Sequence, residues 1–461
     1  MDELIHTSAT KLAKAIRDKK VSSKEVVEAY LEQIAAVNPN LNALVQLAAD
    51  SALTQAKNMD DSLARGESQG PLHGVPMTVK DTLDTAGVVS TWGTPGRKQF
   101  VPKHDSTVVA RMKAAGAILL GKTNAPEFSF SFDTTNPLYG DTKNPYNLKK
   151  TPGGSSGGSA ALLAACGTPI ELGSDTGGSL RLPAHFCGIT AIKPTSGRVP
   201  RTGHAVPFGG ILDYFTQIGP MARYTEDLAL ILPIISGYDV QDPATITVNL
   251  EDPQKVDLCK LRGLFFTDNG IYSPTPETTM AVETAALKLS ETGMEIEEIV
   301  PPGIGDTFDI VSGLFTSDGG AWIRLLLERA GTSLEDTSLK DFASAPSMSA
   351  EQIVHLIDRW DQFRINMNKF MEPYDFILSP VNSFPALDPG EWVEKWSAFS
   401  YTMTHNLTGW PASVVRVATS PEEMPIGVQI AASPWREDIA ISVAQRLETE
   451  FGGWEPPKII R

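Results

Sequence analysis

The chain has 461 residues, 41% of them hydrophobic, and a formal net charge of −16 at pH 7. Such an acidic chain is poor in the clustered lysine and arginine residues that bind nucleic-acid phosphates, so we expect no direct nucleic-acid partner. No apolar run approaches the roughly 18 residues that span a membrane, and the N-terminal stretch MDELIHTSATKLAKAI lacks the basic and apolar regions of a signal peptide. The three cysteines are widely spaced, which favours reduced thiols in a cytoplasmic protein over a disulfide framework or a zinc site.

The first 65 residues are predicted to be helical. Ser22 is followed three residues later by Glu25, a pairing typical of a helix N-terminus, and apolar residues then recur at helical spacing. The stretch that begins at Leu41 predicts a second helix, which ends near Gly66.

Short apolar runs then alternate with helical patterns, an arrangement that favours a mostly parallel or mixed sheet. Residues 77–80 predict a strand because apolar Met77 and Val79 alternate there with polar residues, and residues 105–124 predict a helix, a glycine turn and a strand. The pattern resumes after residue 256, continues through a helix-rich stretch at 306–373, and ends in strands and a final helix. Because no repeat, low-complexity tract or linker divides the chain, we expect a single domain, 1–461.

Two short motifs match known patterns, but the residues in or before them do not suit the structure that each pattern requires. Gly116–Thr123, GAILLGKT, fits the P-loop spacing, yet its three central aliphatic residues indicate a buried strand that ends in Lys122 and would exclude phosphate. Gly154–Gly158, GSSGG, fits the nucleophile elbow of α/β-hydrolases, but the polar, proline-containing residues before it form no buried strand.

Two glycine- and serine-rich stretches, Gly153–Ser159 and Asp175–Ser179, flank a helical run of small residues. Successive N–H groups of the second stretch could converge on one negative oxygen, and such a site beside a serine is what acyl transfer requires. A serine hydroxyl needs a base, and no histidine lies in a recognisable setting. A lysine kept neutral by burial is the alternative, and Lys80, at the end of an apolar strand, is the candidate.

These residues belong to a longer set of motifs that resembles the amidase signature family. The motifs are VKD at Val79–Asp81, GGSSGGSAA at Gly153–Ala161 and GSDTGGSLRLPAHFCGITAIKPTSGRV at Gly173–Val199. Similarity continues through Gln217–Leu232 and returns in NLTGWPA and PIGVQIAA near the C-terminus, so it covers nearly the whole chain. It implies the α/β amidase signature fold, a single large mixed β-sheet flanked by helices on both faces (α/β/α). The expected parts are N-terminal helices at 1–65, a core with the catalytic residues at 66–240, and a C-terminal part at 241–461.

The resemblance also implies a Ser–cis-Ser–Lys triad. Lys80 matches the family's base, Ser155 the bridging serine with a cis peptide bond before it, and Ser179 the nucleophile that forms an acyl-enzyme. The expected oxyanion hole is formed by the N–H groups of Thr176, Gly177, Gly178 and Ser179. Three further residues, Ser156, Asp175 and Arg181, match polar groups that support these loops, and simple loop support is an equal explanation for them. The triad requires neither a metal nor an organic cofactor.

The expected reaction is hydrolysis of a small-molecule amide, and the triad leaves carbamates and esters open. The glutaminase (A) subunit of glutamyl-tRNA(Gln) amidotransferase is the main alternative, but Phe399 stands two residues before Tyr401, where that subunit usually carries an acid. Uncharged or apolar substrates are therefore favoured over glutamine. A non-catalytic binding protein on the same fold is the alternative from another class, and a homodimer is compatible with the sequence.

Aromatic residues suggest the substrate pocket. Phe128, Phe130 and Phe132 occur at alternate positions and could line an apolar wall, although core packing of one strand face is the favoured explanation. The expected pocket residues are Phe128, Phe132, Phe399 and Trp410, with Trp392 and Trp396 as further candidates for the wall of a cleft.

Overall fold

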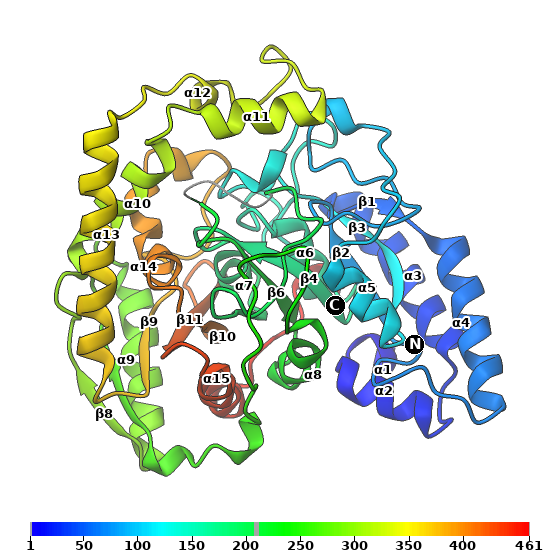
Figure 1. Ribbon diagram of the computed structural model, residues 1–461. Coiled ribbons are helices and arrows are strands. Elements are labelled where there is room, and N and C mark those ends of the chain that lie inside the picture. The colour runs from blue at the N-terminus through cyan, green and yellow to red at the C-terminus, as the bar shows by residue number, and fades with distance from the viewer. Residues whose placement is uncertain (1, 207–211, 461) are drawn as a thin grey trace.

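The structure is a computed structural model, and it describes residues 2–206 and 212–460. One large mixed β-sheet runs through the molecule, and helices surround it (Figure 1). The strands are β1 (Leu44–Leu47), β2 (Pro76–Lys80), β3 (Ile118–Thr123), β4 (Ile170–Asp175), β5 (Thr190–Lys193), β6 (Gln217–Ala222), β7 (Arg262–Phe265), β8 (Glu295–Glu298), β9 (Phe376–Pro380), β10 (Ala412–Thr419) and β11 (Pro425–Ala432). The α/β class and the mixed sheet expected from the sequence are confirmed.

The helices follow the predicted pattern closely. Those of the first half are α1 (Asp2–Ile5), α2 (Ala9–Arg17), α3 (Ser23–Leu41), α4 (Ala49–Ala64), α5 (Thr107–Ala114), α6 (Gly157–Ala164), α7 (Arg181–Phe186) and α8 (Thr225–Ile235). Those of the second half are α9 (Pro276–Glu291), α10 (Thr307–Thr316), α11 (Ala321–Ala330), α12 (Lys340–Ala343), α13 (Ala350–Met371), α14 (Ser400–Thr408) and α15 (Glu437–Phe451). At the start of α3 the predicted capping box is present, because Ser22 Oγ accepts from the Glu25 N–H and the Glu25 carboxylate accepts from the Ser22 N–H.

The sequence prediction of an uninterrupted helix from Leu41 to Gly66 is wrong. The chain leaves α3 at Asn42, which adopts a left-handed conformation with φ 50°, and forms the short strand β1 before α4 begins. Asn38 Oδ1 accepts hydrogen bonds from the N–H groups of Ala43 and Leu44, and β1 then pairs antiparallel with β3. Pairing with a distant strand therefore overrides the helical pattern of these residues.

The strand order is β1-β3-β2-β4-β6-β5-β10-β11-β9-β7-β8. β2 is parallel to β3 and to β4, and β7 is parallel to β8 and to β9, while the remaining pairs are antiparallel. The pairing of β5 with β10 joins the strands of the first half of the chain to those of the second half.

Alternate residues of the central strands face two different layers of helices. In β9, Phe376 and Leu378 pack into the cluster that includes residues of α9 and α15, whereas Ile377 between them packs with residues of α7, α10 and α13. This alternation is the period-2 pattern of a sheet buried on both faces.

The strand register places Lys80 and the Asp175–Ser179 stretch close together, at the carboxyl ends of the parallel strands β2 and β4. Thr78 pairs with Glu171 and Val79 with Leu172. Lys80, the last residue of β2, therefore lies beside the end of β4, which leads into the second glycine- and serine-rich stretch.

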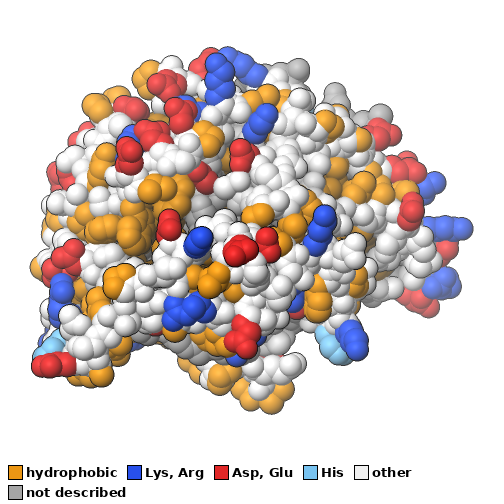
Figure 2. Space-filling view, turned by 90° about the horizontal axis from the view of Figure 1, so that it is seen from above, with side chains coloured by type: hydrophobic (Ala, Val, Ile, Leu, Met, Phe, Trp, Pro, Cys, Tyr) orange, Lys and Arg blue, Asp and Glu red, His pale blue; other side chains and the backbone are white. Residues whose placement is uncertain are grey.

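Figure 2 views the molecule from above, with hydrophobic side chains gathered at one side of this face and acidic and basic side chains interspersed elsewhere. Within the described part of the chain, no helix combines the length and apolar character needed to cross a bilayer.

Candidate active site

Lys80, at the end of β2, contacts Ser155 in the loop before α6. Lys80 Nζ lies 2.6 Å from Ser155 Oγ and 3.0 Å from Ser174 Oγ, which belongs to β4. Lys80, Ser155 and Ser174 are buried. The lysine thus contacts two hydroxyl groups, of which only that of Ser155 was expected from the sequence.

Burial changes the charge of this lysine. Desolvation lowers the pKa of Lys80 from 10.5 to about 7, although the carboxylates of Asp175 and Glu171 act in the opposite direction. A neutral amine has a lone pair that can accept a proton from a hydroxyl group, so Lys80 has the chemistry of a general base near pH 7.

Tight backbone packing positions Ser155. The peptide bond between Gly154 and Ser155 is cis, as the resemblance implies. A side chain at position 154 would place its Cβ atom 2.6 Å from the Asp133 carbonyl oxygen, so only glycine fits there. The adjacent Ser156 connects the two serine-rich stretches, because its N–H donates to the Ser179 carbonyl oxygen at 3.3 Å.

The loop before Ser179 offers three of the four expected oxyanion donors. Within the described residues, the N–H groups of Thr176, Gly177 and Ser179 have no hydrogen-bond acceptor. The Gly178 N–H instead donates to Asp175 Oδ1 at 2.8 Å. The expected role of Gly178 as a free oxyanion donor is therefore wrong in this structure, because a buried carboxylate already occupies its N–H.

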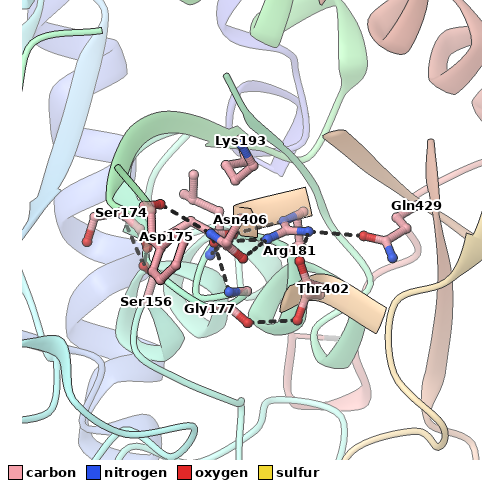
Figure 3. A network of polar contacts seen from close by, with 12 residues as sticks. Ser156, Ser174, Asp175, Gly177, Arg181, Lys193, Thr402, Asn406 and Gln429 are labelled. Carbon is pink, nitrogen blue, oxygen red and sulfur yellow. Dashed lines mark hydrogen bonds and ion pairs between the residues drawn. The ribbon is translucent and has the colours of Figure 1, made fainter. Parts of the chain in front are cut away.

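A buried polar network holds this loop (Figure 3). The guanidinium of Arg181 donates to both carboxylate oxygens of Asp175 at 3.0 Å, and Asn406 bonds to both residues. Burial alone would raise the pKa of Asp175, but the charge of Arg181 and these hydrogen bonds hold it at about 2. Thr402, one turn before Asn406 on α14, donates to the Gly177 carbonyl oxygen at 2.8 Å.

An apolar cavity lies in front of Ser179, which is 5% exposed. The space in front of Ser179 measures about 560 Å³ when the open solvent at its mouth is counted. Its apolar lining residues are Phe130, Phe132, Val206, Phe315, Phe342, Trp392, Trp396 and Met403, and the others are Ser129, Ser131, Thr176, Gly177 and Ser179. The described lining thus contains no charged side chain.

Of the four pocket residues expected from the sequence, only Phe132 lines this cavity. Phe399 is fully buried behind Phe132, with ring centroids 4.1 Å apart, and forms a second layer. Phe128 packs with residues of α11, because the chain forms a turn with φ 48° at Phe128 and alternate residues do not share a face there. Trp410 lies in the core, where its indole N–H donates to Asn368. Phe128, Phe399 and Trp410 are therefore corrections to the predicted pocket.

Several residues of the site carried no signal in the sequence analysis. Phe315 and Phe342 come from the helix-rich stretch, which shows no motif, and Ser174 stands out in the sequence only as part of the family pattern. Thr402 and Asn406 lie four residues apart, as two neighbours on one helix face do. In the described chain, no group of three or more His, Cys, Asp and Glu side chains is arranged to hold a metal ion.

Comparisons with known proteins identify the family of this chain. The family model described as Amidase matches residues 25–440. Indoleacetamide hydrolase of Bradyrhizobium diazoefficiens is 35% identical over 468 residues, which cover 96% of this chain and 86% of that protein. The glutamyl-tRNA(Gln) amidotransferase (A) subunit of Carboxydothermus hydrogenoformans is 32% identical over 486 residues, which cover 97% of this chain and 98% of that protein.

Among solved structures, 6-aminohexanoate cyclic dimer hydrolase in complex with substrate superimposes with a TM-score of 0.89 and 27% identity, covering 99% of this chain and 100% of that chain. The similarity in sequence and in fold spans the sheet, the buried lysine and both serine-rich stretches. The chain belongs to the amidase family.

Proposed function

We propose that this protein hydrolyses the C–N bond of carboxylic amides through an acyl-enzyme on Ser179. The observation that carries the proposal is the 2.6 Å contact between Ser155 and the buried amine of Lys80, whose pKa is about 7. Acyl transfer needs a base near neutrality beside a serine relay, and a serine nucleophile open to the substrate; Lys80 and Ser155 supply the first, and Ser179, which lines the apolar cavity, supplies the second.

In the proposed reaction, Lys80 Nζ accepts the Ser155 proton while Ser155 Oγ takes the proton of Ser179. Ser179 Oγ forms a bond to the substrate carbonyl carbon, and the negative oxygen binds at the free N–H groups of the 176–179 loop. The C–N bond then breaks, and the amine leaves with the proton returned through Ser155. Water, deprotonated by the same relay, cleaves the ester on Ser179 and releases the carboxylic acid.

The cavity supports an apolar or aryl substrate. Six aromatic rings line it, and aromatic walls bind flat apolar groups by stacking and by edge-to-face contacts. We propose amides with an aromatic acyl or amine part as the preferred class, and the similarity to an indoleacetamide hydrolase supports this choice. Carbamates and esters present the same carbonyl geometry and are the next substrates to test.

A glutaminase subunit of an amidotransferase is the second candidate, and the full-length similarity to such a protein favours it. Glutamine carries an ammonium group and a carboxylate, and both need partners when they leave water. The described cavity lining offers neither an acid nor a base, and Phe399 is apolar and buried. We therefore prefer the apolar amide over glutamine.

A substrate screen of the isolated protein, a glutaminase assay with partner subunits and tRNA, and fluorophosphonate labelling together separate these candidates. The substrates are indole-3-acetamide, acetanilide, propionamide, a phenyl carbamate and glutamine, and Ser179→Ala serves as the control variant. Hydrolysis of the aryl amides, lost in Ser179→Ala, is the expected result. Glutaminase activity that appears only with partner subunits and tRNA would favour the second candidate. A fluorophosphonate that fails to label Ser179 would favour a binding protein and exclude both.

Three further proposals concern the protein as a whole. Strands from all three parts of the chain share one sheet, which supports a single domain over 1–461. All three cysteines carry free thiols, which fits a reducing compartment such as the cytoplasm. The isolated chain, as a monomer or a homodimer, is the proposed catalytic unit, and it acts on a small-molecule amide.

A further inference from the structure

A histidine contacts the second hydroxyl that Lys80 touches. Ser174 Oγ lies 3.0 Å from Lys80 Nζ and 2.9 Å from Nε2 of His204. His204 is 3% exposed and lies far from Lys80 in sequence. The proposed reaction does not use this ring.

The backbone determines which ring nitrogen carries the proton. The Val206 N–H donates to His204 Nδ1 at 3.1 Å, so the neutral ring bears its proton on Nε2. Burial, with the charge of Lys80, lowers the pKa of His204 to about 3, so the ring is neutral at pH 7. Nε2–H can therefore only donate, and the nearer acceptor is Ser174 Oγ, since Thr82 Oγ1 lies at 3.4 Å.

We propose that His204 is a positioning residue for Lys80, and that it acts through Ser174. The inference rests on the function proposed above. The Nε2–H group fixes the Ser174 hydroxyl against Lys80 Nζ, which keeps the amine aligned with Ser155. The partly positive Nε2–H hydrogen also points at Ser174 Oγ, the oxygen that would accept a hydrogen bond from protonated Lys80. Because this contact disfavours the protonated lysine, it favours the neutral amine that acts as the base.

The surrounding backbone holds the ring in this place. The Ala205 N–H donates to the Thr82 carbonyl oxygen and the Asp84 N–H to the Gly203 carbonyl oxygen, both at 2.8 Å. The histidine is thus tied to the segment that directly follows Lys80 in β2. Val206 in addition lines the substrate cavity, so the same short segment contacts both the cavity and the Ser174 hydroxyl beside the base.

Other ionisable groups also act on this pair. Asp175 and Glu171 of β4 face Lys80 and raise its pKa, while Lys80 and Arg201 face His204 and lower its pKa. The test must leave these four residues unchanged and vary only the donor at position 204.

Two substitutions at position 204, to glutamine and to asparagine, differ in whether a donor still reaches Ser174. In His204→Gln the longer side chain reaches the Nε2 position and can donate to Ser174. In His204→Asn the shorter side chain can still accept from the Val206 N–H, but it stops short of Ser174. His185→Asn is the matched control, because His185 is equally buried and also accepts a backbone N–H at Nδ1, yet its Nε2 faces the Phe384 carbonyl oxygen.

The measurement is the rate at which a fluorophosphonate labels Ser179 between pH 5 and 9, together with amide hydrolysis by the same variants. In His204→Asn we expect the midpoint of the acid limb to rise by about one pH unit, which is about a tenfold loss in rate below it. His204→Gln should keep the wild-type midpoint, and His185→Asn should keep it even if the melting temperature falls. In a Ser174→Ala background, His204→Asn should cause no further shift.

Each other outcome overturns the inference. If folded His204→Asn keeps the wild-type midpoint of the acid limb, His204 does not position Lys80, and the proposed function is unaffected. Equal shifts in the two amide variants, or a shift that persists without the Ser174 hydroxyl, show that the histidine does not act through Ser174. Wild-type protein that neither reacts with the probe nor hydrolyses amides removes the proposed function and this inference with it.

Discussion

Replacing Lys80 with methionine should inactivate the protein without destabilising it at pH 7. Methionine has a similar length and is apolar, so it fills the same buried space. The pKa of the wild-type lysine falls from 10.5 to about 7 because burial disfavours its charge. Each pH unit corresponds to about 1.4 kcal/mol, so keeping this lysine in the fold costs on the order of 5 kcal/mol at pH 7.

The lost hydrogen bonds oppose this gain. Ser155 and Ser174 each lose a buried partner in Lys80→Met, at a cost of about 1–3 kcal/mol for each hydroxyl. The variant should therefore be about as stable as the wild type at pH 7, or more stable by a few kcal/mol. Urea unfolding followed by tryptophan fluorescence measures the difference, and the amide assay should detect no turnover.

The pH dependence provides the decisive comparison. Between pH 7 and 10.5 the unfolded wild type still binds the Lys80 proton while the folded form has lost it, so wild-type stability rises with pH in this window. Relative to that of Lys80→Met, the free energy of unfolding of the wild type should rise by up to about 1.4 kcal/mol per pH unit from pH 7 to 9. Below about pH 6 the difference between the two proteins should not change with pH. Parallel stability curves for the two proteins would refute the neutral lysine and, with it, the base.

Three further changes test the rest of the site. Ser179→Ala should abolish hydrolysis while the circular dichroism spectrum and the melting temperature stay those of the wild type. Arg181→Met should lower the free energy of unfolding by about 3–5 kcal/mol, measured by urea titration, because Asp175 is left buried without its cation. In the wild type, the stabilisation from the low pKa of Asp175 is present above about pH 4 and is lost as the pH falls toward 2. Phe132→Ala should raise KM for aryl amides by roughly three- to tenfold, because it removes the ring stacked on Phe399.

Internal controls keep these results interpretable. Propionamide is too small to need an aromatic wall, so Phe132→Ala should leave its kcat/KM near the wild-type value. An equal loss for both substrates would show that the wall supports the fold and does not select the substrate. Turnover by Ser179→Ala after complete purification would remove Ser179 as nucleophile, and an Arg181→Met protein of unchanged stability would contradict the buried ion pair.

The sequence predicts the parts of this site that lie in regular local structure. Alternating residues identify β2 and place Lys80 at its end, and glycine-rich stretches mark both serine loops. The loop geometry is less accessible, since Gly178 has the residue type of an oxyanion donor but its N–H is bound by Asp175. Only the three-dimensional arrangement shows which backbone groups remain free.

Elements decided by distant contacts could not be predicted. β1 is a four-residue strand that exists because β3 lies beside it, and nothing local distinguishes it from the helix that follows. Part of the cavity lining is missed for a similar reason: Phe132, Trp392 and Trp396 were expected and line the cavity, but Phe315 and Phe342 come from a distant segment that shows no motif. Alternation at Phe128 pointed to a shared face, but a turn at that residue directs its ring elsewhere.

A low pKa does not by itself make a lysine a base in this protein. Burial lowers the pKa of Lys122 to about 8 and that of Lys193 to about 7, so both resemble Lys80 in this respect. Lys122, however, bonds to groups of the loop after β2, and Lys193 donates to the Pro194 carbonyl oxygen. Of the three, only Lys80 contacts a hydroxyl in the serine-rich stretch that bonds to Ser179. Its function therefore depends on the hydroxyl groups around it, and substitutions that move Ser155 or Ser174 should reduce activity even where the lysine stays neutral.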